Sequence, residues 1–200
     1  CFINMLINTQ FILASSSKSR FKTLKNLNLN FSTMKPLCNE EEIKKSLKKT
    51  KSFQIAKHLA KAKAQSISQK YSKEMVVGCD TVLVFQNEII NKAKNLNEAF
   101  MKIKKLSGQK HKIISAASVC RNNKQIWSCH QTSIVSLRKL NKNNIEDYLK
   151  ESGKKILNSV GCYQVELLGP TIIENIKGDF FNVMGFPLFP FLKFMQSQEV

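Results

Sequence analysis

The hydrophobic residues follow two spacings along the chain: short apolar runs typical of buried strands, and longer stripes with the period of a helix. The runs cover residues 11–14, 75–85, 111–120 and 125–137, and shorter strands are predicted at 156–166, 171–176 and 180–184. The stripes cover residues 18–27, 51–71, 96–106, 141–152 and 188–195. Because these elements interleave without an internal repeat, the pattern predicts an α/β fold with a mixed central β-sheet flanked by helices.

A chain of 200 residues is long enough for one domain with a sizeable core. We expect residues 11–196 to form a single domain, preceded by an N-terminal extension of residues 1–10. The longest apolar run near the C-terminus, residues 186–192, is far shorter than the roughly 20 residues that span a bilayer. The sequence therefore predicts no membrane association.

The most informative stretch is Met75-Val-Val-Gly-Cys-Asp-Thr-Val-Leu-Val-Phe85, which reads as two buried strands around a glycine, interrupted by Asp80. A buried carboxylate without a partner costs several kcal/mol. Asp80 therefore either pairs with a basic group and faces a cleft, or it is a turn residue. The basic candidate with helical spacing is Lys63, which lies on an apolar helix face, either snorkelling to solvent or directed into a site.

A second candidate feature is the junction between the strand at residues 11–14 and the helix that follows. Ser15 and Ser17 lie there, Ser17 is a natural N-cap, and Arg20 lies in the first turn. Free N–H groups at a helix N-terminus favour anions, so the junction predicts an anion site. The alternative interpretation is an ordinary cap with an exposed arginine.

The formal net charge of +18 suggests an anionic partner. Only three of the 32 basic residues are Arg, and bidentate phosphate recognition favours Arg, so we expect a solvated lysine-rich surface and no specific nucleic acid. The six cysteines are scattered without paired spacing, and the three histidines have no metal-ligand spacing. These features predict a reduced, cytoplasmic protein without zinc.

Several motifs resemble, in order, those of the Maf (septum formation) proteins. Leu13-Ala-Ser-Ser-Ser-Lys-Ser-Arg20 resembles their opening L-A-S-x-S-P-R-R signature, and Val77-Gly-Cys-Asp-Thr81 is similar to their central G-A-D-T. The further matching segments are Leu59-Ala-Lys-Ala-Lys63-Ala, Asn91-Lys92, Leu106-Ser-Gly108 with His111, Val160-Gly-Cys-Tyr163 and Gly178-Asp-Phe-Phe-Asn-Val-Met-Gly-Phe-Pro187. The resemblance covers nearly the whole chain, which makes it much more specific than one short pattern.

The resemblance implies a cytoplasmic, house-cleaning nucleoside triphosphate pyrophosphatase. Such an enzyme hydrolyses the α–β phosphate bond of a non-canonical or modified nucleotide, giving the monophosphate and pyrophosphate, with a divalent cation (Mg²⁺ or Mn²⁺). The resemblance also implies two lobes around a nucleotide cleft, as in inosine-triphosphatase-like folds, and a homodimer.

The resemblance also assigns roles to individual residues. Asp80 matches the proton acceptor that activates water, and Glu40 matches an acidic residue that would share a metal ion with Asp80. The positions that match phosphate-binding residues are Ser15, Ser17, Arg20, Lys63 and Lys92. Thr81 and Glu166 match positions that select the base. A triphosphate needs this mixture, because cationic groups and a metal neutralise its charge as pyrophosphate leaves.

The chain departs from the family pattern at several positions. Lys18 and Ser19 replace a proline and an arginine of the signature, and Asn158-Ser159 replaces an Asp-Lys pair, so cations are missing. This motivates an alternative function, a catalytically weakened nucleotide-binding regulator of septum formation and cell division. The substrate also stays open, because Glu166 resembles the 7-methyl-GTP branch whereas Thr81 resembles the dTTP/UTP branch.

Overall fold

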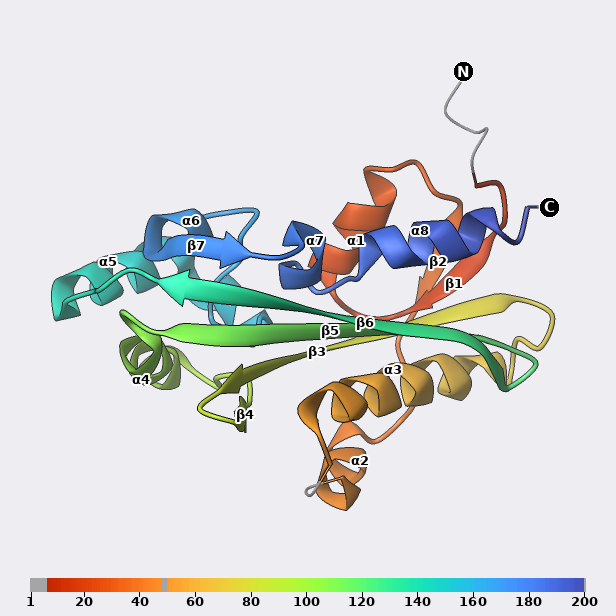
Figure 1. Cartoon of the computed structure of the whole chain (residues 1–200), viewed down its shortest axis with the longest axis horizontal. Helices are drawn as coiled ribbons and strands as arrows, with labels where there is room; N and C mark the ends of the chain where they lie inside the picture. The colour runs from red at the N-terminus through yellow and green to blue at the C-terminus, as the bar shows by residue number, and fades with distance from the viewer. Residues whose placement is uncertain (1–6, 48–49, 200) are drawn as a thin grey trace. The chain divides into compact units, whose positions relative to one another are not determined.

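A seven-stranded β-sheet forms the centre of the fold in the computed structural model, which describes residues 7–47 and 50–199 (Figure 1). The strand order is β2-β1-β3-β5-β6-β7, and β4 pairs with β3. The strands are β1 (Phe11–Ala14), β2 (Phe31–Met34), β3 (Met75–Phe85), β4 (Glu88–Ile90), β5 (Lys110–Arg121), β6 (Lys124–Leu137) and β7 (Ile173–Lys177). The β1 strand pairs in parallel with β2 and β3, whereas β4 and β7 pair antiparallel, so the sheet is mixed as predicted.

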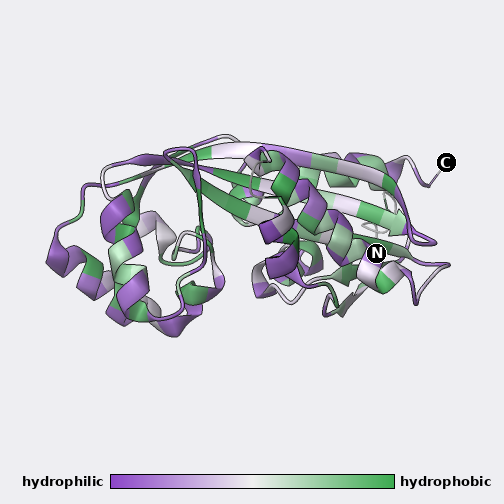
Figure 2. Cartoon of the chain, turned by 90° about the horizontal axis from the view of Figure 1, so that it is seen from below, coloured by the Kyte–Doolittle hydropathy of each residue, from purple (hydrophilic) through white to green (hydrophobic). Residues whose placement is uncertain are grey.

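Helices flank this sheet, which confirms the predicted α/β fold (Figure 1). They are α1 (Lys18–Lys25), α2 (Glu40–Ser46), α3 (Ser52–Ser68), α4 (Leu96–Leu106), α5 (Lys142–Ser152), α6 (Gly169–Ile172), α7 (Phe180–Val183) and α8 (Leu188–Gln196), with a 3₁₀ helix at Gly153–Asn158. Within the described ranges, none of them is long and apolar enough to cross a membrane. Figure 2 shows hydrophobic residues concentrated on the strands, while the helices alternate between hydrophobic and hydrophilic residues.

The chain divides into two compact units. The first contains the chain up to Thr81, Ser115–Gln131 and the segment from Gly185 onward, and the second contains Val82–Ile114 and Thr132–Met184. Strands β3, β5 and β6 therefore contribute residues to both units. Of the predicted N-terminal extension, residues 1–6 lie outside the described part of the chain.

In the first unit, α3 covers one face of the strands, and α1 and α8 cover the other (Figure 1). The apolar stripe of α3 is buried as its spacing predicted, and the aromatic rings of Phe186 and Phe191 pack edge to face near β1. Gly78 on β3 lets α3 approach closely, because a Cβ built there would lie 2.1 Å from the Ala60 carbonyl oxygen and 2.5 Å from the Ala64 nitrogen. Both are backbone atoms, which cannot yield as a flexible side chain would.

Replacing Gly78 by alanine is expected to lower the free energy of unfolding by about 3 kcal/mol, because the added methyl group overpacks the contact between β3 and α3. Urea-induced unfolding followed by circular dichroism measures the loss. Ser32→Ala on the exposed face of β2 is the control and should change stability by less than about 0.5 kcal/mol. A Gly78→Ala protein as stable as the wild type would contradict this close approach.

The second unit has its own hydrophobic core, built from β3, α4, α5 and the segment around Tyr163. Asn95 caps α4 by accepting from the Glu98 N–H, and Asn141 caps α5 in a reciprocal capping box. The His111 ring is buried in this unit, with Nε2 2.6 Å from the Tyr163 hydroxyl. Burial lowers the pKa of His111 from 6.5 to about 4.

This depressed pKa makes the stability of the protein depend on pH. The unfolded chain binds a proton at His111 more readily than the folded chain, so the stabilisation is complete above about pH 6.5 and is lost as the pH falls toward about 4. Between about pH 7.5 and about pH 5, His111 should account for a loss of about 2 kcal/mol. Urea unfolding at both pH values should show a smaller loss for His111→Gln, whereas His58→Gln, on an exposed surface of α3, should behave like the wild type.

Three sequence predictions about local structure are wrong. The stretch at 75–85 is one continuous strand, because Asp80 has a partner and does not interrupt it. Residues 156–166 are 3₁₀ and turn structure, with Cys162 at a φ of +56° that a strand does not allow. Residues 180–184 form α7 and a turn, because the Asp179 side chain caps the Asn182 N–H at 2.9 Å. Apolar spacing in such short runs does not distinguish these structures from strands.

Candidate active site

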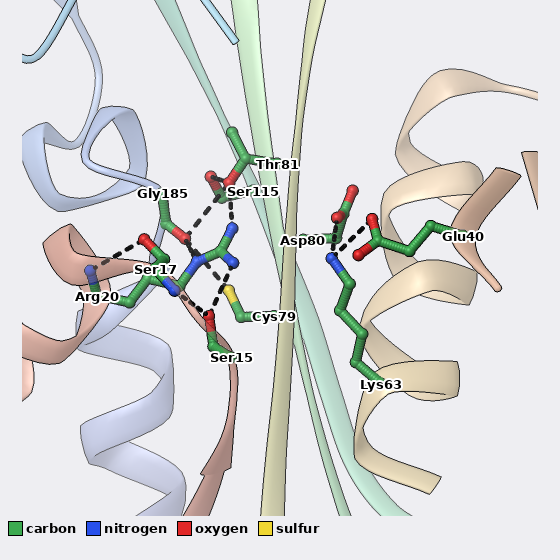
Figure 3. Close-up of polar contacts among 10 residues, drawn as sticks. All are labelled: Ser15, Ser17, Arg20, Glu40, Lys63, Cys79, Asp80, Thr81, Ser115 and Gly185. Carbon is green, nitrogen blue, oxygen red and sulfur yellow. Dashed lines mark hydrogen bonds and ion pairs between the residues drawn. The ribbon is translucent and has the colours of Figure 1, made fainter. Parts of the chain in front are cut away.

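Successive side chains of β3 point to opposite sides of the strand, which separates two polar clusters of the first unit (Figure 3). On one side Asp80 meets Lys63 and Glu40, which we call the carboxylate–lysine cluster. On the other side Thr81 meets the guanidinium of Arg20. The arginine cluster consists of Arg20 and the residues around it: Ser15, Ser17, Cys79, Thr81, Ser115 and Gly185.

The carboxylate–lysine cluster is built by three elements. Lys63 shares the buried face of α3 with Leu59 and Ile67, and its Nζ lies 2.6 Å from Asp80 Oδ1. Glu40 is in the first turn of α2, which the Asn39 side chain caps, and its Oε2 lies 3.1 Å from the same Nζ. The ammonium therefore lies between two carboxylates, one on the sheet and one on a helix (Figure 3).

Burial decides the electrostatics of this cluster. The side chains of Lys63 and Asp80 are only 8% and 9% exposed, whereas that of Glu40 is 43% exposed. Burial by itself lowers the pKa of Lys63, but the Asp80 and Glu40 carboxylates together outweigh it, so the pKa is raised and the ammonium stays charged. The interpretation of Asp80 as a turn residue is therefore wrong, and so is that of Lys63 as a snorkelling side chain.

One carboxylate oxygen of Asp80 remains available. Its Oδ2 is buried and has no hydrogen-bond partner among residues 7–47 and 50–199. An unpaired buried oxygen of this kind is costly, and such groups call for a functional explanation. Asp80 Oδ2 can accept a proton or bind a cation, while Oδ1 is held by Lys63.

The arginine cluster begins at the junction between β1 and α1. Ser17 caps α1 by accepting from the Arg20 N–H at 3.4 Å, as its position predicted, and Ser15 Oγ accepts from the Ser17 N–H at 3.2 Å. Arg20 is not the exposed side chain of the alternative interpretation. Its Nε donates to the Gly185 carbonyl at 2.7 Å and its Nη2 to Thr81 Oγ1 at 2.9 Å.

The two remaining predicted site residues belong to the second unit. Lys92 is exposed in the segment that follows β4, and Glu166 is half-buried in the turn before α6. The structure thus places seven of the nine predicted positions in the two clusters of the first unit; the other two are described in their own unit.

Sequence reasoning missed three members of the arginine cluster. Cys79 donates its thiol to the Gly185 carbonyl at 3.2 Å, and Ser115 Oγ lies 2.9 Å from Thr81 Oγ1. Gly185 lies within the Maf-like segment that ends at Pro187, so the sequence indicated this glycine but not its contact with Arg20. Ser115 gave one weak signal, a hydroxyl within an otherwise apolar part of its strand.

The residues present fit a divalent cation that takes most of its ligands from elsewhere. No group of three or more His, Cys, Asp or Glu side chains able to hold a metal occurs in the described ranges. Mg²⁺ is usually bound through one or two carboxylates together with substrate phosphates and water. The unpartnered Asp80 Oδ2, with Glu40 nearby, meets that smaller requirement.

Together, the clusters of the first unit combine cationic groups with a proton acceptor. Arg20 and Lys63 supply positive charge for a polyanion, and Asp80 supplies a carboxylate oxygen that can take a proton from water. Cationic groups of this kind stabilise charge that develops on a leaving group. The arrangement is suited to hydrolysis of an anionic ester or anhydride.

Comparison with known proteins identifies related sequences along almost the whole chain. A family model described as "Maf-like protein" matches residues 10–198. A protein of Bartonella henselae named "7-methyl-GTP pyrophosphatase" is 37% identical over 98% of this chain and 98% of its own length. A second protein of that name, from Bartonella quintana, is 38% identical over 90% of this chain and 91% of its own. A Legionella pneumophila protein named "Nucleoside triphosphate pyrophosphatase" is 33% identical over 94% of both chains.

Proposed function

The chain belongs to the Maf family, and we propose that it is a nucleoside triphosphate pyrophosphatase that hydrolyses the α–β phosphate bond of a nucleotide. The products are the nucleoside monophosphate and pyrophosphate. The observation that carries the proposal is the buried Asp80 carboxylate, which is held at Oδ1 by Lys63 and unpartnered at Oδ2 among the described residues. The names of the relatives agree with this activity.

Asp80 is the proton acceptor of the reaction. A water molecule attacks the α-phosphorus, its proton passes to Asp80 Oδ2, and the bond to the bridging oxygen breaks so that pyrophosphate leaves with the bonding electrons. Lys63 orients the Asp80 carboxylate through the 2.6 Å contact. A carboxylate is a weak base, so its use requires a water molecule that is more acidic than bulk water.

The phosphate groups of the nucleotide are bound by cationic and hydroxyl side chains. Arg20 and Lys63 provide the charge in the first unit, and Ser15 and Ser17 order the N-terminus of α1, where N–H groups favour an anion. We assign Lys92 of the second unit to the same role because of its match to the family motif. These residues neutralise charge as it moves to the departing pyrophosphate.

Asp80 and Glu40 would hold a divalent cation, Mg²⁺ or Mn²⁺. When bound, such a cation neutralises phosphate charge and lowers the pKa of a coordinated water. The donors fit because Asp80 Oδ2 is unpartnered within the described chain and Glu40 is partly exposed.

We place 7-methyl-GTP first among the candidate substrates. The two Bartonella relatives of that name are 37% and 38% identical to this chain, and Glu166 agrees with a base that presents donors. We retain Glu166 as the position expected to select the base; Thr81 matches a second such position of the family, but its hydroxyl is hydrogen-bonded to Arg20. The expected cytoplasmic location, house-cleaning role and homodimer stay predictions; light scattering after gel filtration measures the last.

A nucleotide panel tests the proposed function. Purified protein is incubated with dTTP, UTP, CTP and 7-methyl-GTP, with Mg²⁺ or Mn²⁺, and the release of pyrophosphate and of the monophosphate is measured. We expect equal amounts of both products and no activity after removal of the cation with a chelator. Release of inorganic phosphate instead would indicate a different bond, and no turnover of any nucleotide would overturn the proposal.

The alternative function, a nucleotide-binding regulator with weakened catalysis, is not favoured. The motif departures that suggested it remove cations, but the structure retains the Asp80–Lys63 pair and the Arg20 contacts. The regulator predicts tight nucleotide binding without products, so the same panel distinguishes the two functions.

A further inference from the structure

The guanidinium of Arg20 is held in place by the chain's own groups. Its Nε donates to the Gly185 carbonyl at 2.7 Å, its Nη2 to Thr81 Oγ1 at 2.9 Å, and its Nη1 to Ser15 Oγ at 3.4 Å (Figure 3). A guanidinium has five N–H donors in a fixed fork. Three of them are used by these contacts, and the remaining two are on the terminal nitrogens.

Thr81 is the central residue among these hydrogen-bond partners of Arg20. Its Oγ1 accepts from Arg20, and it also lies 2.9 Å from Ser115 Oγ and 3.3 Å from the Gly185 carbonyl oxygen. A threonine hydroxyl has one donor and two acceptor positions, so it can accept from Arg20 while donating to Ser115 or Gly185. The hydroxyl is thus oriented toward an arginine and is already engaged within the chain.

The Gly185 carbonyl is another of these hydrogen-bond partners. It accepts from Arg20 Nε, and it also lies 3.2 Å from Cys79 Sγ. Gly185 has a φ of +101°, a backbone conformation that other residues rarely adopt. A Cβ at this position would lie 3.2 Å from Thr81 Oγ1. The absence of a side chain therefore lets the Gly185 carbonyl, the Thr81 hydroxyl and the Arg20 guanidinium lie close together.

We infer that Thr81 is a positioning residue for the phosphate-binding Arg20, acting with Ser115 and the Gly185 carbonyl, and that it acts on every nucleotide alike. The inference rests on the proposed function for the role of Arg20. Its physical basis is pre-organisation: a long arginine side chain that is already fixed loses little freedom when phosphate binds. The two roles for Thr81, base selection and arginine positioning, make different predictions.

Two substitutions separate these roles. Thr81→Val keeps the shape and removes the hydroxyl, whereas Thr81→Ser keeps the hydroxyl. We expect Thr81→Val to lower kcat/KM by about 10- to 100-fold, by the same factor for 7-methyl-GTP, dTTP and UTP, and Thr81→Ser to remain near the wild type. Thr23→Val, at another buried threonine of the first unit, is the matched control and should leave kcat/KM unchanged.

Binding of inorganic pyrophosphate provides a test that does not depend on turnover. Pyrophosphate carries no nucleobase, so base selection cannot affect its binding. Isothermal titration calorimetry with pyrophosphate and Mg²⁺ should show about 10-fold weaker binding for Thr81→Val and unchanged binding for Thr81→Ser and Thr23→Val. If Thr81 selects the base, pyrophosphate binding stays at the wild-type level and the ratio of kcat/KM between nucleotides changes. Unchanged binding of pyrophosphate to Thr81→Val, or a changed ratio of kcat/KM between nucleotides, would overturn the inference.

Coupling to Arg20 completes the experiment. In an Arg20→Lys background the fork is absent, so adding Thr81→Val should cause little further loss of pyrophosphate affinity. An undiminished loss in that background would mean that Thr81 acts independently of Arg20, against the inference. Wild-type protein that binds pyrophosphate but hydrolyses no nucleotide contradicts the proposed function alone, and protein that does not bind pyrophosphate contradicts the positioning role.

Discussion

Asp80→Asn is expected to lower kcat for nucleotide hydrolysis by roughly 10²- to 10⁴-fold, the usual contribution of a general base. The amide keeps the shape of the side chain but cannot take the proton from water at Oδ2. Because Lys63 retains Glu40 at 3.1 Å, the protein should stay folded and should still bind nucleotide. Steady-state kinetics with the preferred nucleotide, together with equilibrium binding, measures both quantities.

Asp147→Asn is the matched control for this substitution. Asp147 is exposed on α5, so the same chemical change there should leave kcat within about twofold of the wild type. Full activity of Asp80→Asn would exclude Asp80 as the proton acceptor. A loss confined to KM would assign Asp80 to ground-state binding.

Lys63→Met is expected to reduce both stability and activity. It leaves the Asp80 carboxylate buried without its cation, and breaking a buried pair in this way costs about 3 to 5 kcal/mol. It also removes a positive charge that stabilises the departing pyrophosphate, which should lower kcat/KM by roughly 10²- to 10³-fold. Urea unfolding at neutral pH and steady-state kinetics measure the two effects.

A double substitution separates the charge effect from simple loss of packing. Adding Asp80→Asn to Lys63→Met removes the stranded charge, so stability should recover in part although activity does not. Lys61 lies on the same helix outside the cluster, so Lys61→Met should change neither the stability nor the activity appreciably. If the double variant is less stable than Lys63→Met alone, the unpaired carboxylate is not the cause of the loss.

Local features of the fold could be predicted because their causes lie within a few residues. The predicted N-cap at Ser17 forms, since it depends on a side chain and an N–H three positions away, and Asn39, Asn95 and Asn141 cap their helices by equally local contacts. The helical stripe that buries Lys63 was also correctly predicted. The errors fall on short apolar runs, such as residues 180–184, where the cap at Asp179 outweighs a spacing that fits a strand.

The candidate site, like the fold, could be predicted from the sequence only in part. Family motifs placed Arg20, Lys63 and Asp80 on the appropriate elements, and the two-residue period of a strand already separates Asp80 from Thr81. The sequence alone did not indicate which partners lie on each side. The contact of Arg20 with Gly185 joins residues 165 positions apart, and that of Thr81 with Ser115 joins residues 34 apart.

The sequence by itself therefore determined the α/β class, most of the elements and the candidate residues for binding a polyanion. Only the tertiary structure decided that Lys63 lies between Asp80 and Glu40, and that Thr81 faces Arg20. The reason is physical. Periodicity and capping follow from the backbone of a few neighbouring residues, whereas a hydrogen bond between distant segments exists only when packing of α1, α3 and β3 brings the donors and acceptors together.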